Sequence, residues 1–239
     1  MVLLAIETAT PVCGVALLRD GRTLMERSLD VGKVHAERLA VMVNDGLAEV
    51  SLAPSDVEAV AVSCGPGSFT GLRIGLSFAK GFVLAGDAGL VLVPTLEGLA
   101  AHVAVCDRNV CAILRARRGE FYAAVYVVGA AGSLREIAGA AVVRDEELAA
   151  FCPRGCVVVG QTDQLSDEVA AALRYEREAV IVPAERCAAR ASLIGWLGMD
   201  RVRRGEWADI DTAEPFYLQE FVARRPETIH AEDTGSRSR

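Results

Sequence analysis

The stretch SCGPGSFTGLR, Ser63–Arg73, stands between an apolar segment that ends at Val62 and an apolar helical pattern that begins at Leu72. A strand, a Gly-Pro-Gly turn and a helix start in this order expose backbone N–H groups where an anion is favoured. The alternative is a sharp turn whose helix is capped by a hydroxyl. The glycine spacing matches neither a P-loop nor a dinucleotide-binding fingerprint. The candidates to face a phosphate here are Gly65, Gly67, Ser68 and Thr70.

Length and composition set the class of protein. The chain has 239 residues, which suffice for one large domain or two lobes. Hydrophobic residues make up 52% and the mean hydropathy is +0.30, which indicates a large buried or partner-covered surface. The net charge of −7 disfavours direct binding of nucleic acid, so we expect any contact with RNA to be indirect, through a partner.

The cysteines and the apolar runs indicate the compartment. The seven cysteines contain no Cys-x-x-Cys pair, so free thiols in a reducing cytoplasm are expected, with no metal. No histidine falls at ligand spacing from them. No stretch reaches the roughly 18 apolar residues of a membrane span, and Glu7 interrupts the first apolar run. We therefore expect cytoplasmic localisation and no membrane.

The first half of the chain reads as strands followed by alternating helices and strands. Asp20-Gly21 is a hairpin signal between the second and third strands. Three meandering strands before alternating units predict a mixed sheet with helices on both faces. The predicted strands are Val2–Ile6, Gly14–Leu18, Thr23–Ser28, Asp56–Val62 and Leu90–Val93, and the predicted helices are His35–Val50, Leu72–Ala85 and 94–105.

The second half repeats this order more loosely. Its predicted strands are Val110–Arg115, Phe121–Val128, Cys156–Val159 and Ala179–Val182, and its predicted helices are Glu146–Phe151, Asp163–Leu173 and Glu185–Arg203. We expect an N-terminal lobe over 1–105 and a C-terminal lobe over 106–223. The last helix is a candidate to pack back on the first lobe. The polar tail, 224–239, is expected to be disordered.

The first two helices indicate a partner chain. The helix Leu72–Ala85 is apolar nearly all round and must be covered on more than one side. Gly71, Gly75 and Ala79 form a smooth stripe that would admit another helix. The alternative is a deeply buried internal helix, and a homodimer and a heterodimer would leave the same pattern. The predicted contact residues are His35, Leu39, Met42, Val43, Leu72, Gly75, Leu76, Ala79 and Lys80.

Four motifs together resemble the TsaB (YeaZ) family. They are LAIETAT at Leu4–Thr10, GPGSFTGLRIG at Gly65–Gly75, RRGEFY at Arg117–Tyr122 and PFYL at Pro215–Leu218. The resemblance implies a two-lobed α/β fold of the actin-like ATPase (ASKHA) class, each lobe an RNase-H-like mixed sheet flanked by helices. It also implies a non-catalytic relative of TsaD.

The same resemblance implies partners. Members pair with a TsaD-type catalytic subunit and a TsaE-type ATPase to make threonylcarbamoyladenosine in tRNA. They pair through their first two helices, so a homodimer is expected when the chain is alone. No cofactor is expected to be tightly bound, and ATP or ADP is a candidate ligand at the partner interface.

Departures from the family pattern bear on catalysis. The first strand usually ends in Asp where this chain has Glu7, and Arg115 reverses the charge that the family usually has there. His35 has no second histidine one helical turn later, so we expect no metal site and no catalytic residue. The alternative is an ATP-dependent actin-like phosphotransferase or hydrolase that uses the inter-lobe cleft, with Glu7 and Thr8 facing a phosphate. Arg117 and Arg118 are predicted to form a solvated turn, with contact to tRNA inside a complex as the alternative.

Overall fold

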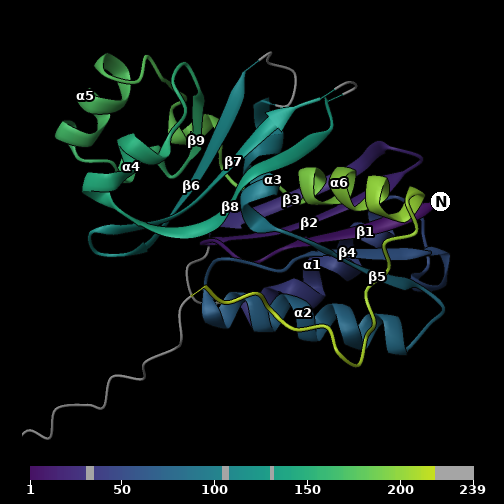
Figure 1. Ribbon diagram of the computed structural model, residues 1–239. Helices are drawn as coiled ribbons and strands as arrows, with labels where there is room; N and C mark the ends of the chain where they lie inside the picture. The colour runs from purple at the N-terminus through teal and green to yellow at the C-terminus, as the bar shows by residue number, and fades with distance from the viewer. Residues whose placement is uncertain (31–34, 104–107, 130–131, 219–239) are drawn as a thin grey trace, which may run out of the picture.

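The first lobe is built on a five-stranded mixed sheet. The computed structural model describes residues 1–30, 35–103, 108–129 and 132–218 (Figure 1). The strand order is β3-β2-β1-β4-β5, with β4 and β5 parallel to β1 and the other pairs antiparallel. Both β1 and β4 are buried along their whole length, as their unbroken apolar runs predict. The bounds are β1 Val2–Glu7, β2 Val12–Arg19, β3 Arg22–Asp30, β4 Ala59–Ser63 and β5 Gly89–Val93.

The helices of the first lobe begin and end close to the predicted residues. They are α1 (His35–Glu49), α2 (Phe69–Leu84) and α3 (Thr95–Ala100). Helix α2 starts before Leu72 because the Ser68 hydroxyl accepts a hydrogen bond from the Gly71 N–H, 3.2 Å away, and caps it. A short 3₁₀ turn, Pro54–Asp56, delays the start of β4. A second 3₁₀ turn, Ala101–Val103, follows α3.

The second lobe repeats the topology of the first. Its sheet has the order β10-β9-β6-β7-β8, with the same parallel and antiparallel pairs at equivalent positions. Its strands are β6 Asn109–Arg117, β7 Glu120–Val128, β8 Leu134–Arg144, β9 Val157–Gly160 and β10 Val180–Ile181. Strand β8 was not predicted from the sequence, because its alanines and glycine give a weak apolar pattern.

Two helices of the second lobe start later than predicted, and the first starts one residue earlier. They are α4 (Asp145–Phe151), α5 (Asp167–Tyr175) and α6 (Ala191–Arg203). The predicted helix from Asp163 is a 3₁₀ turn followed by α5, which Ser166 caps by accepting from the Val169 N–H. The predicted helix from Glu185 is likewise a 3₁₀ turn, an extended link and then α6.

The last helix of each lobe packs on the sheet of the other lobe. Helix α3 follows the first sheet but packs on β6, β7 and β9, and α6 follows the second sheet but packs on β1, β2, β4 and β5 (Figure 1). The first sheet is therefore covered by α1 and α2 on one face and by α6 on the other. Where α3 meets α6, Arg201 and Glu97 form a largely buried ion pair with a nitrogen–oxygen distance of 2.5 Å.

After α6 the chain returns along the first lobe. We call residues 205–218 the C-terminal segment; it runs along α2 to the N-terminal end of that helix (Figure 1). The Ala208 N–H donates to the Leu90 carbonyl at 2.9 Å, and the Phe216 N–H donates to the Cys64 carbonyl at 2.7 Å. Ala213 is buried in the core between α2 and the sheet. The predicted tail, 224–239, lies outside the described residues, among which no helix is long and apolar enough to cross a membrane.

Candidate functional site

The glycines of the central motif pack α2 against its own lobe. A Cβ on Gly71 would lie 2.0 Å from the Thr8 carbonyl oxygen, and one on Gly75 would lie 2.2 Å from the Thr8 hydroxyl. A Cβ on Gly67 would lie 2.4 Å from the Ala9 carbonyl oxygen. The stripe of Gly71, Gly75 and Ala79 therefore admits the end of β1 and not a second helix, which corrects the expectation from sequence.

The polar groups of Glu7 and Thr8 are used inside the first lobe. Glu7 is 1% exposed, and its Oε1 accepts from the N–H groups of Ala9 and Thr10 at 2.9 and 3.2 Å. Burial raises the pKa of Glu7 to about 7. The Thr8 hydroxyl donates to the Gly71 carbonyl at 2.8 Å. The expectation that Glu7 and Thr8 face a phosphate is therefore wrong, because both side chains are buried and hydrogen-bonded within the lobe.

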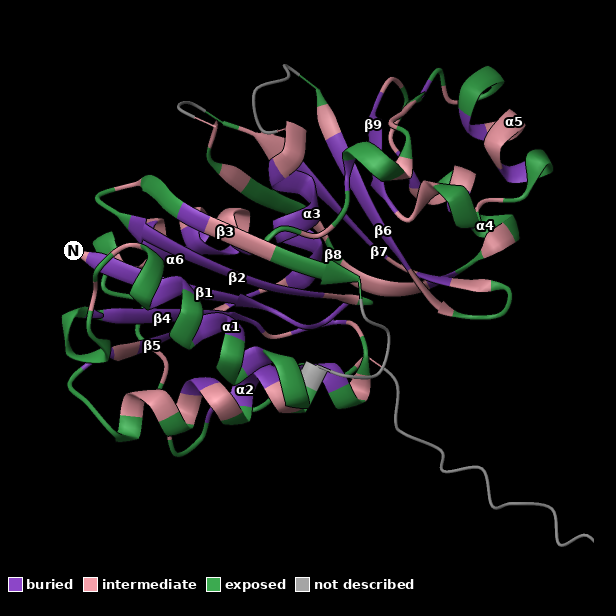
Figure 2. Ribbon diagram, turned by 180° about the vertical axis from the view of Figure 1, so that it is seen from behind, coloured by how far each residue is buried: buried purple, intermediate pink, exposed green. Residues whose placement is uncertain are grey.

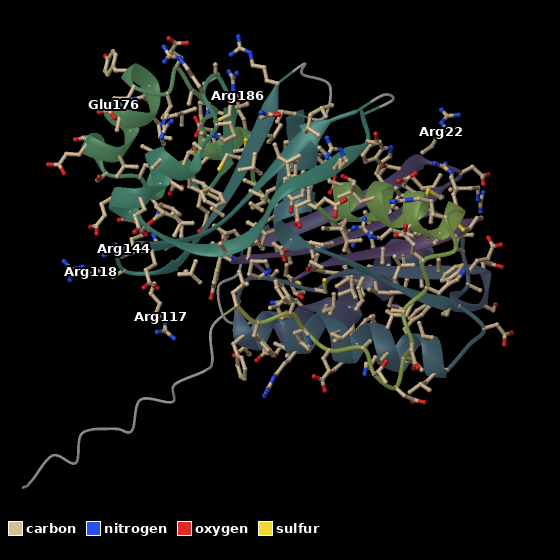
Figure 3. The ribbon with its side chains drawn as sticks, viewed as in Figure 1. Arg22, Arg117, Arg118, Arg144, Glu176 and Arg186 are labelled. Atoms are coloured by element: carbon tan, nitrogen blue, oxygen red, sulfur yellow. The ribbon has the colours of Figure 1, made fainter. Side chains whose placement is uncertain are left out.

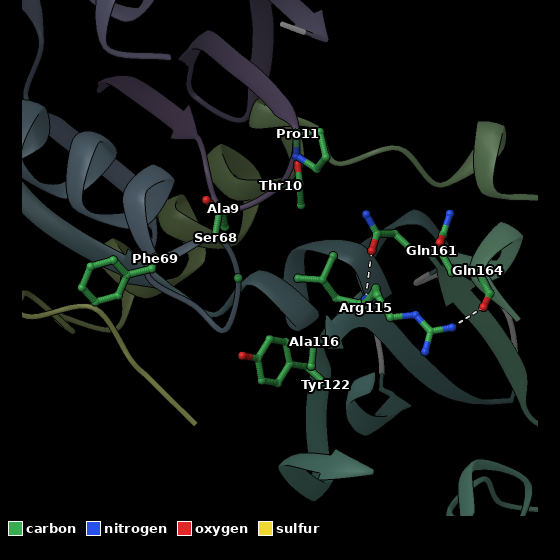
Figure 4. Close-up of a pocket in the computed structure, with 12 residues that line it drawn as sticks. Ala9, Thr10, Pro11, Ser68, Phe69, Arg115, Ala116, Tyr122, Gln161 and Gln164 are labelled. Atoms are coloured by element: carbon green, nitrogen blue, oxygen red, sulfur yellow. Dashed lines mark hydrogen bonds between the residues drawn. The ribbon is translucent and has the colours of Figure 1, made fainter. Parts of the chain in front are cut away.

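A cleft of about 610 Å³ lies between the lobes (Figure 4). Of the residues predicted to face a phosphate, Gly67 and Ser68 line it, whereas Thr70 is exposed outside its lining and Gly65 is buried on the other side of the loop. The Ser68 hydroxyl caps α2 by accepting a hydrogen bond from the Gly71 N–H. The other lining residues are Ala9, Thr10, Pro11, Phe69, Leu114, Arg115, Ala116, Tyr122, Gln161 and Gln164.

Arg115 forms a wall of this cleft. Its guanidinium donates to the Asp145 carboxylate at 2.8 Å and to the Gln164 carbonyl, and it lies 3.8 Å from the centre of the Phe121 ring. Its backbone N–H donates to the Gln161 side chain at 2.9 Å (Figure 4). The positive charge is thus compensated within the second lobe. Among the residues that the structure describes, no cluster of three or more His, Cys, Asp or Glu could hold a metal ion.

The β6–β7 turn carries the two arginines singled out in the sequence. Arg117 and Arg118 are exposed, and they extend outward at one corner of the second lobe beside Arg144 (Figure 3). Arg144 pairs with the carboxylates of Glu146 and Glu147, at 3.0 and 2.6 Å.

The residues predicted to contact a partner lie mostly in the core. Positions spaced i, i+3 and i+4 mark the face of a helix that covers its own sheet, and the structure buries this face of α1 and α2. The choice of contact residues is therefore corrected. Lys80 is half-buried, and the His35 side chain lies outside the described part of the structure. The buried positions are Leu39, Met42, Val43, Leu72, Gly75, Leu76 and Ala79.

The opposite face of the same two helices is open. Val41 on α1 is 50% exposed and Leu84 on α2 is 74% exposed. A Cβ on Gly81 would meet no atom within 4 Å. Helices α1 and α2 pack side by side, so their exposed stripes adjoin (Figure 2). We call this surface the outer face; its residues are Ala40, Val41, Asn44, Ala48, Ser77, Gly81 and Leu84.

Comparison with known proteins identifies the relatives of the chain. Residues 30–180 match the family model described as TsaD, tRNA N6-adenosine threonylcarbamoyltransferase. The threonylcarbamoyladenosine biosynthesis protein TsaB of Bacillus subtilis strain 168 is 36% identical over 126 residues, which cover 53% of this chain and 55% of that protein. The TsaB protein of Escherichia coli K12 is 39% identical over 128 residues, with the same coverage. The chain thus spans about half the length of the curated relatives it matches.

Solved structures extend the likeness over nearly the whole chain. A Pseudomonas aeruginosa protein described as similar to the peptidase YeaZ has a TM-score of 0.78 and 30% identity, covering 91% of this chain and 99% of its own. A ROK hexokinase from Thermus thermophilus, 12% identical with a TM-score of 0.53, shares the fold alone. The five-stranded mixed sheet that occurs twice, with helices on its faces and a cleft between the two lobes, is the two-lobed α/β fold of the actin-like ASKHA class. Within that class, the chain belongs to the TsaB (YeaZ) family, a branch of the wider TsaD family.

Proposed function

We propose that the protein is a non-catalytic subunit in the formation of threonylcarbamoyladenosine in tRNA, and that it acts by docking on a TsaD-type catalytic subunit. The names of its relatives supply the pathway. The docking role is proposed because of the outer face of α1 and α2. It combines exposed apolar side chains, Val41 and Leu84, with small residues that let another helix approach closely.

The flank of α1 limits where this surface can extend. Asp45 and Glu49 turn toward β3, where both pair with Arg27 at 3.4 and 2.7 Å. The stripe Ala40, Asn44 and Ala48 carries no formal charge, so burying it against another helix desolvates no ion. An uncharged, partly apolar stripe beside a charged flank is suited to a helical interface. In the absence of a partner, the same face would form a homodimer.

The inter-lobe cleft supports a role other than catalysis for this chain. Glu7 is bound to its own loop, and the charge of Arg115 is compensated by Asp145. We therefore place any ATP or ADP of the assembly at the interface with the partner and not in this cleft. A TsaE-type ATPase would complete the assembly, and contact with tRNA would run through the partner.

The test is the mass of the assembly, measured by light scattering after size exclusion. The chain alone is expected at twice its 25.3 kDa mass, and the mixture with the TsaD-type protein of the same organism at the sum of one copy of each. The double variant Val41→Glu, Leu84→Glu should remain folded, since both side chains are exposed. It should be monomeric and should bind the partner at least about 100-fold more weakly, because two carboxylates would be buried without counter-ions.

A matched control makes the same chemical change elsewhere. Tyr175 and Ile137 are exposed apolar residues on α5 and β8 of the second lobe, and the double variant Tyr175→Glu, Ile137→Glu should assemble as the wild type does. Met42→Glu and Leu76→Glu are unsuitable because these side chains are core residues whose replacement would unfold the lobe. Normal assembly of the Val41→Glu, Leu84→Glu variant would overturn the proposal.

The cleft itself is the observation that favours a second function, an ATP-dependent phosphotransferase or hydrolase. That function requires magnesium-dependent ATP turnover by the purified chain alone. We expect none above the rate of a protein-free blank.

A further inference from the structure

A second cavity, of about 310 Å³, lies between the lobes on the other side of the Gly-Pro-Gly loop. Gly67 and Ser68 line the large cleft, whereas Gly65 and Pro66 line the second cavity, so the loop separates the two. Its volume is at the lower end of the range for small-molecule sites. Nothing in the proposed docking role uses this cavity.

The apolar walls of the second cavity are fixed in place. Pro66 and Leu96 come from the first lobe and α3, and Phe216 comes from the C-terminal segment. The Phe216 N–H donates to the Cys64 carbonyl at 2.7 Å. A Cβ on Gly65, whose φ is +118°, would lie 2.3 Å from the Phe216 carbonyl oxygen, so glycine is required for this approach. The cavity is therefore preformed, and Phe216 is part of its lining.

Two polar side chains line it: Tyr126, which is buried, and Glu136, which is exposed to solvent. Tyr126 on β7 and Glu136 on β8 are directly paired across the two strands, so their side chains share one face of the sheet. Both line the cavity. The Glu136 Oε1 lies 3.3 Å from the position of a Cβ on Gly139, another lining residue. The carboxylate therefore stands at the cavity wall.

Neither group is satisfied by the protein. Tyr126 is only 3% exposed, yet no described residue hydrogen-bonds to its hydroxyl. Every fully buried side-chain oxygen in the described ranges has a partner, so the Tyr126 hydroxyl must keep an accessible surface, which the cavity supplies. None of the ion pairs found among residues 1–30, 35–103, 108–129 and 132–218 includes Glu136.

The charge at the second cavity is negative and comes from Glu136. Arg201, the nearby cation, is paired with Glu97 at 2.5 Å. Burial raises the pKa of the Cys64 thiol to about 11 and raises the pKa of Tyr126 as well, so both groups are neutral at pH 7. The cavity thus presents one carboxylate, one free hydroxyl and apolar walls.

We infer that the second cavity binds a small organic cation with an apolar body. The ammonium or guanidinium group would sit between the Glu136 carboxylate and the Tyr126 hydroxyl, both of which can accept its N–H groups. The apolar body would lie against Pro66 and Leu96, and Phe216, which also lines the cavity, adds an aromatic ring that favours a cation.

The probes are phenethylammonium, phenethyl alcohol and phenylacetate, which share a phenyl body and differ in charge. Binding is measured by titration of the ¹⁵N-labelled full chain, followed by NMR. We expect phenethylammonium to bind with a Kd of about 1 mM, as suits a ligand of so few atoms. The alcohol and the anion should bind at least about tenfold more weakly. The amide signals that shift should include those of Tyr126, Glu136 and Phe216.

Two variants test how much the Glu136 charge and the Tyr126 hydroxyl contribute to binding of the probes. Glu136→Gln should weaken phenethylammonium binding about tenfold and leave the alcohol unchanged, and Tyr126→Phe should weaken it about threefold. The control, Glu168→Gln, changes an exposed carboxylate on α5 and should have no effect. Equal binding of the three probes, no binding at 20-fold the expected Kd, shifts confined to the large cleft, or an unchanged preference in Glu136→Gln would each overturn the inference.

Discussion

Replacing Glu7 by glutamine should make the stability of the protein less dependent on pH. The buried carboxyl group has a pKa of about 7 in the folded protein, against an ordinary value of 4.5 that applies in the unfolded chain. At about 1.4 kcal/mol for each pKa unit, this difference corresponds to roughly 3 kcal/mol of folding free energy. The cause is desolvation, which the hydrogen bonds from the Ala9 and Thr10 N–H groups only partly offset.

The direction of the change in stability with pH follows from which state, folded or unfolded, holds the proton on Glu7. Below pH 4.5 both states hold the proton, and between pH 4.5 and 7 only the folded state holds it. The wild type should therefore lose about 3 kcal/mol of stability as pH rises through this window, and the loss should level off above it. Glu7→Gln keeps an oxygen that can accept from the Ala9 and Thr10 N–H groups but cannot ionise. The stability difference between variant and wild type should therefore grow by about 3 kcal/mol in favour of the variant.

The assay is urea unfolding of both proteins at pH 4.5, 5.5, 6.5 and 7.5, at one protein concentration, because self-association would add a concentration-dependent term. Glu168→Gln on α5 serves as the control and should run parallel to the wild type, since its carboxylate is exposed. A stability difference between Glu7→Gln and wild type that stays constant across this range would show that Glu7 is ionised throughout, and would refute the account of the buried carboxyl.

Two further predictions concern packing, and a third concerns the ion pair between α3 and α6. Gly75→Ala should cost at least about 2 kcal/mol in urea unfolding, because its Cβ would lie 2.2 Å from the Thr8 hydroxyl; an unchanged midpoint would contradict the proposed contact. Gly81→Ala in the same helix has no neighbour within 4 Å in its own chain; made in the monomeric Val41→Glu, Leu84→Glu background, it should stabilise the chain by about 1 kcal/mol, and a loss there would show that another part of the chain covers Gly81. Arg201→Met should cost about 3–5 kcal/mol by leaving Glu97 buried and unpaired, and the double variant with Glu97→Gln should recover most of it; equal losses in the single and double variants would argue against a coupled pair.

Sequence patterns predicted the order of elements in the first lobe because its strands and helices carry strong signals. The unbroken apolar runs of β1 and β4, and the Asp20-Gly21 turn with φ values of 52° and 87°, appear as expected. Strand β8 was missed because its order depends on pairing with β7, and its own small residues give no clear period. Local pattern also could not show that α6 is separated from Glu185 by an extended link.

The site was harder to predict than the fold, for two physical reasons. The apolar periodicity of α1 and α2 identifies the face that covers their own sheet, so Met42 and Leu76 were chosen over Val41 and Leu84. The purpose of Gly71 and Gly75 depends on Thr8, which is distant in sequence and is brought beside them only by the pairing of β1 with β4. The second cavity likewise combines residues from both lobes and the C-terminal segment.

Hydrogen–deuterium exchange of the chain, alone and mixed with the TsaD-type protein of the same organism, tests the docking claim most directly. Because the free chain is expected to use the same face in a homodimer, the Val41→Glu, Leu84→Glu variant provides the uncovered reference for α1 and α2. Relative to that reference, the account predicts slower exchange in peptides that span residues 36–48 and 77–84 of the wild type in the complex with the TsaD-type protein, isolated from the mixture by size exclusion, with no change in α5 and β10. Protection confined to the second lobe, or wild-type exchange in the mixture that matches the variant throughout, would contradict it.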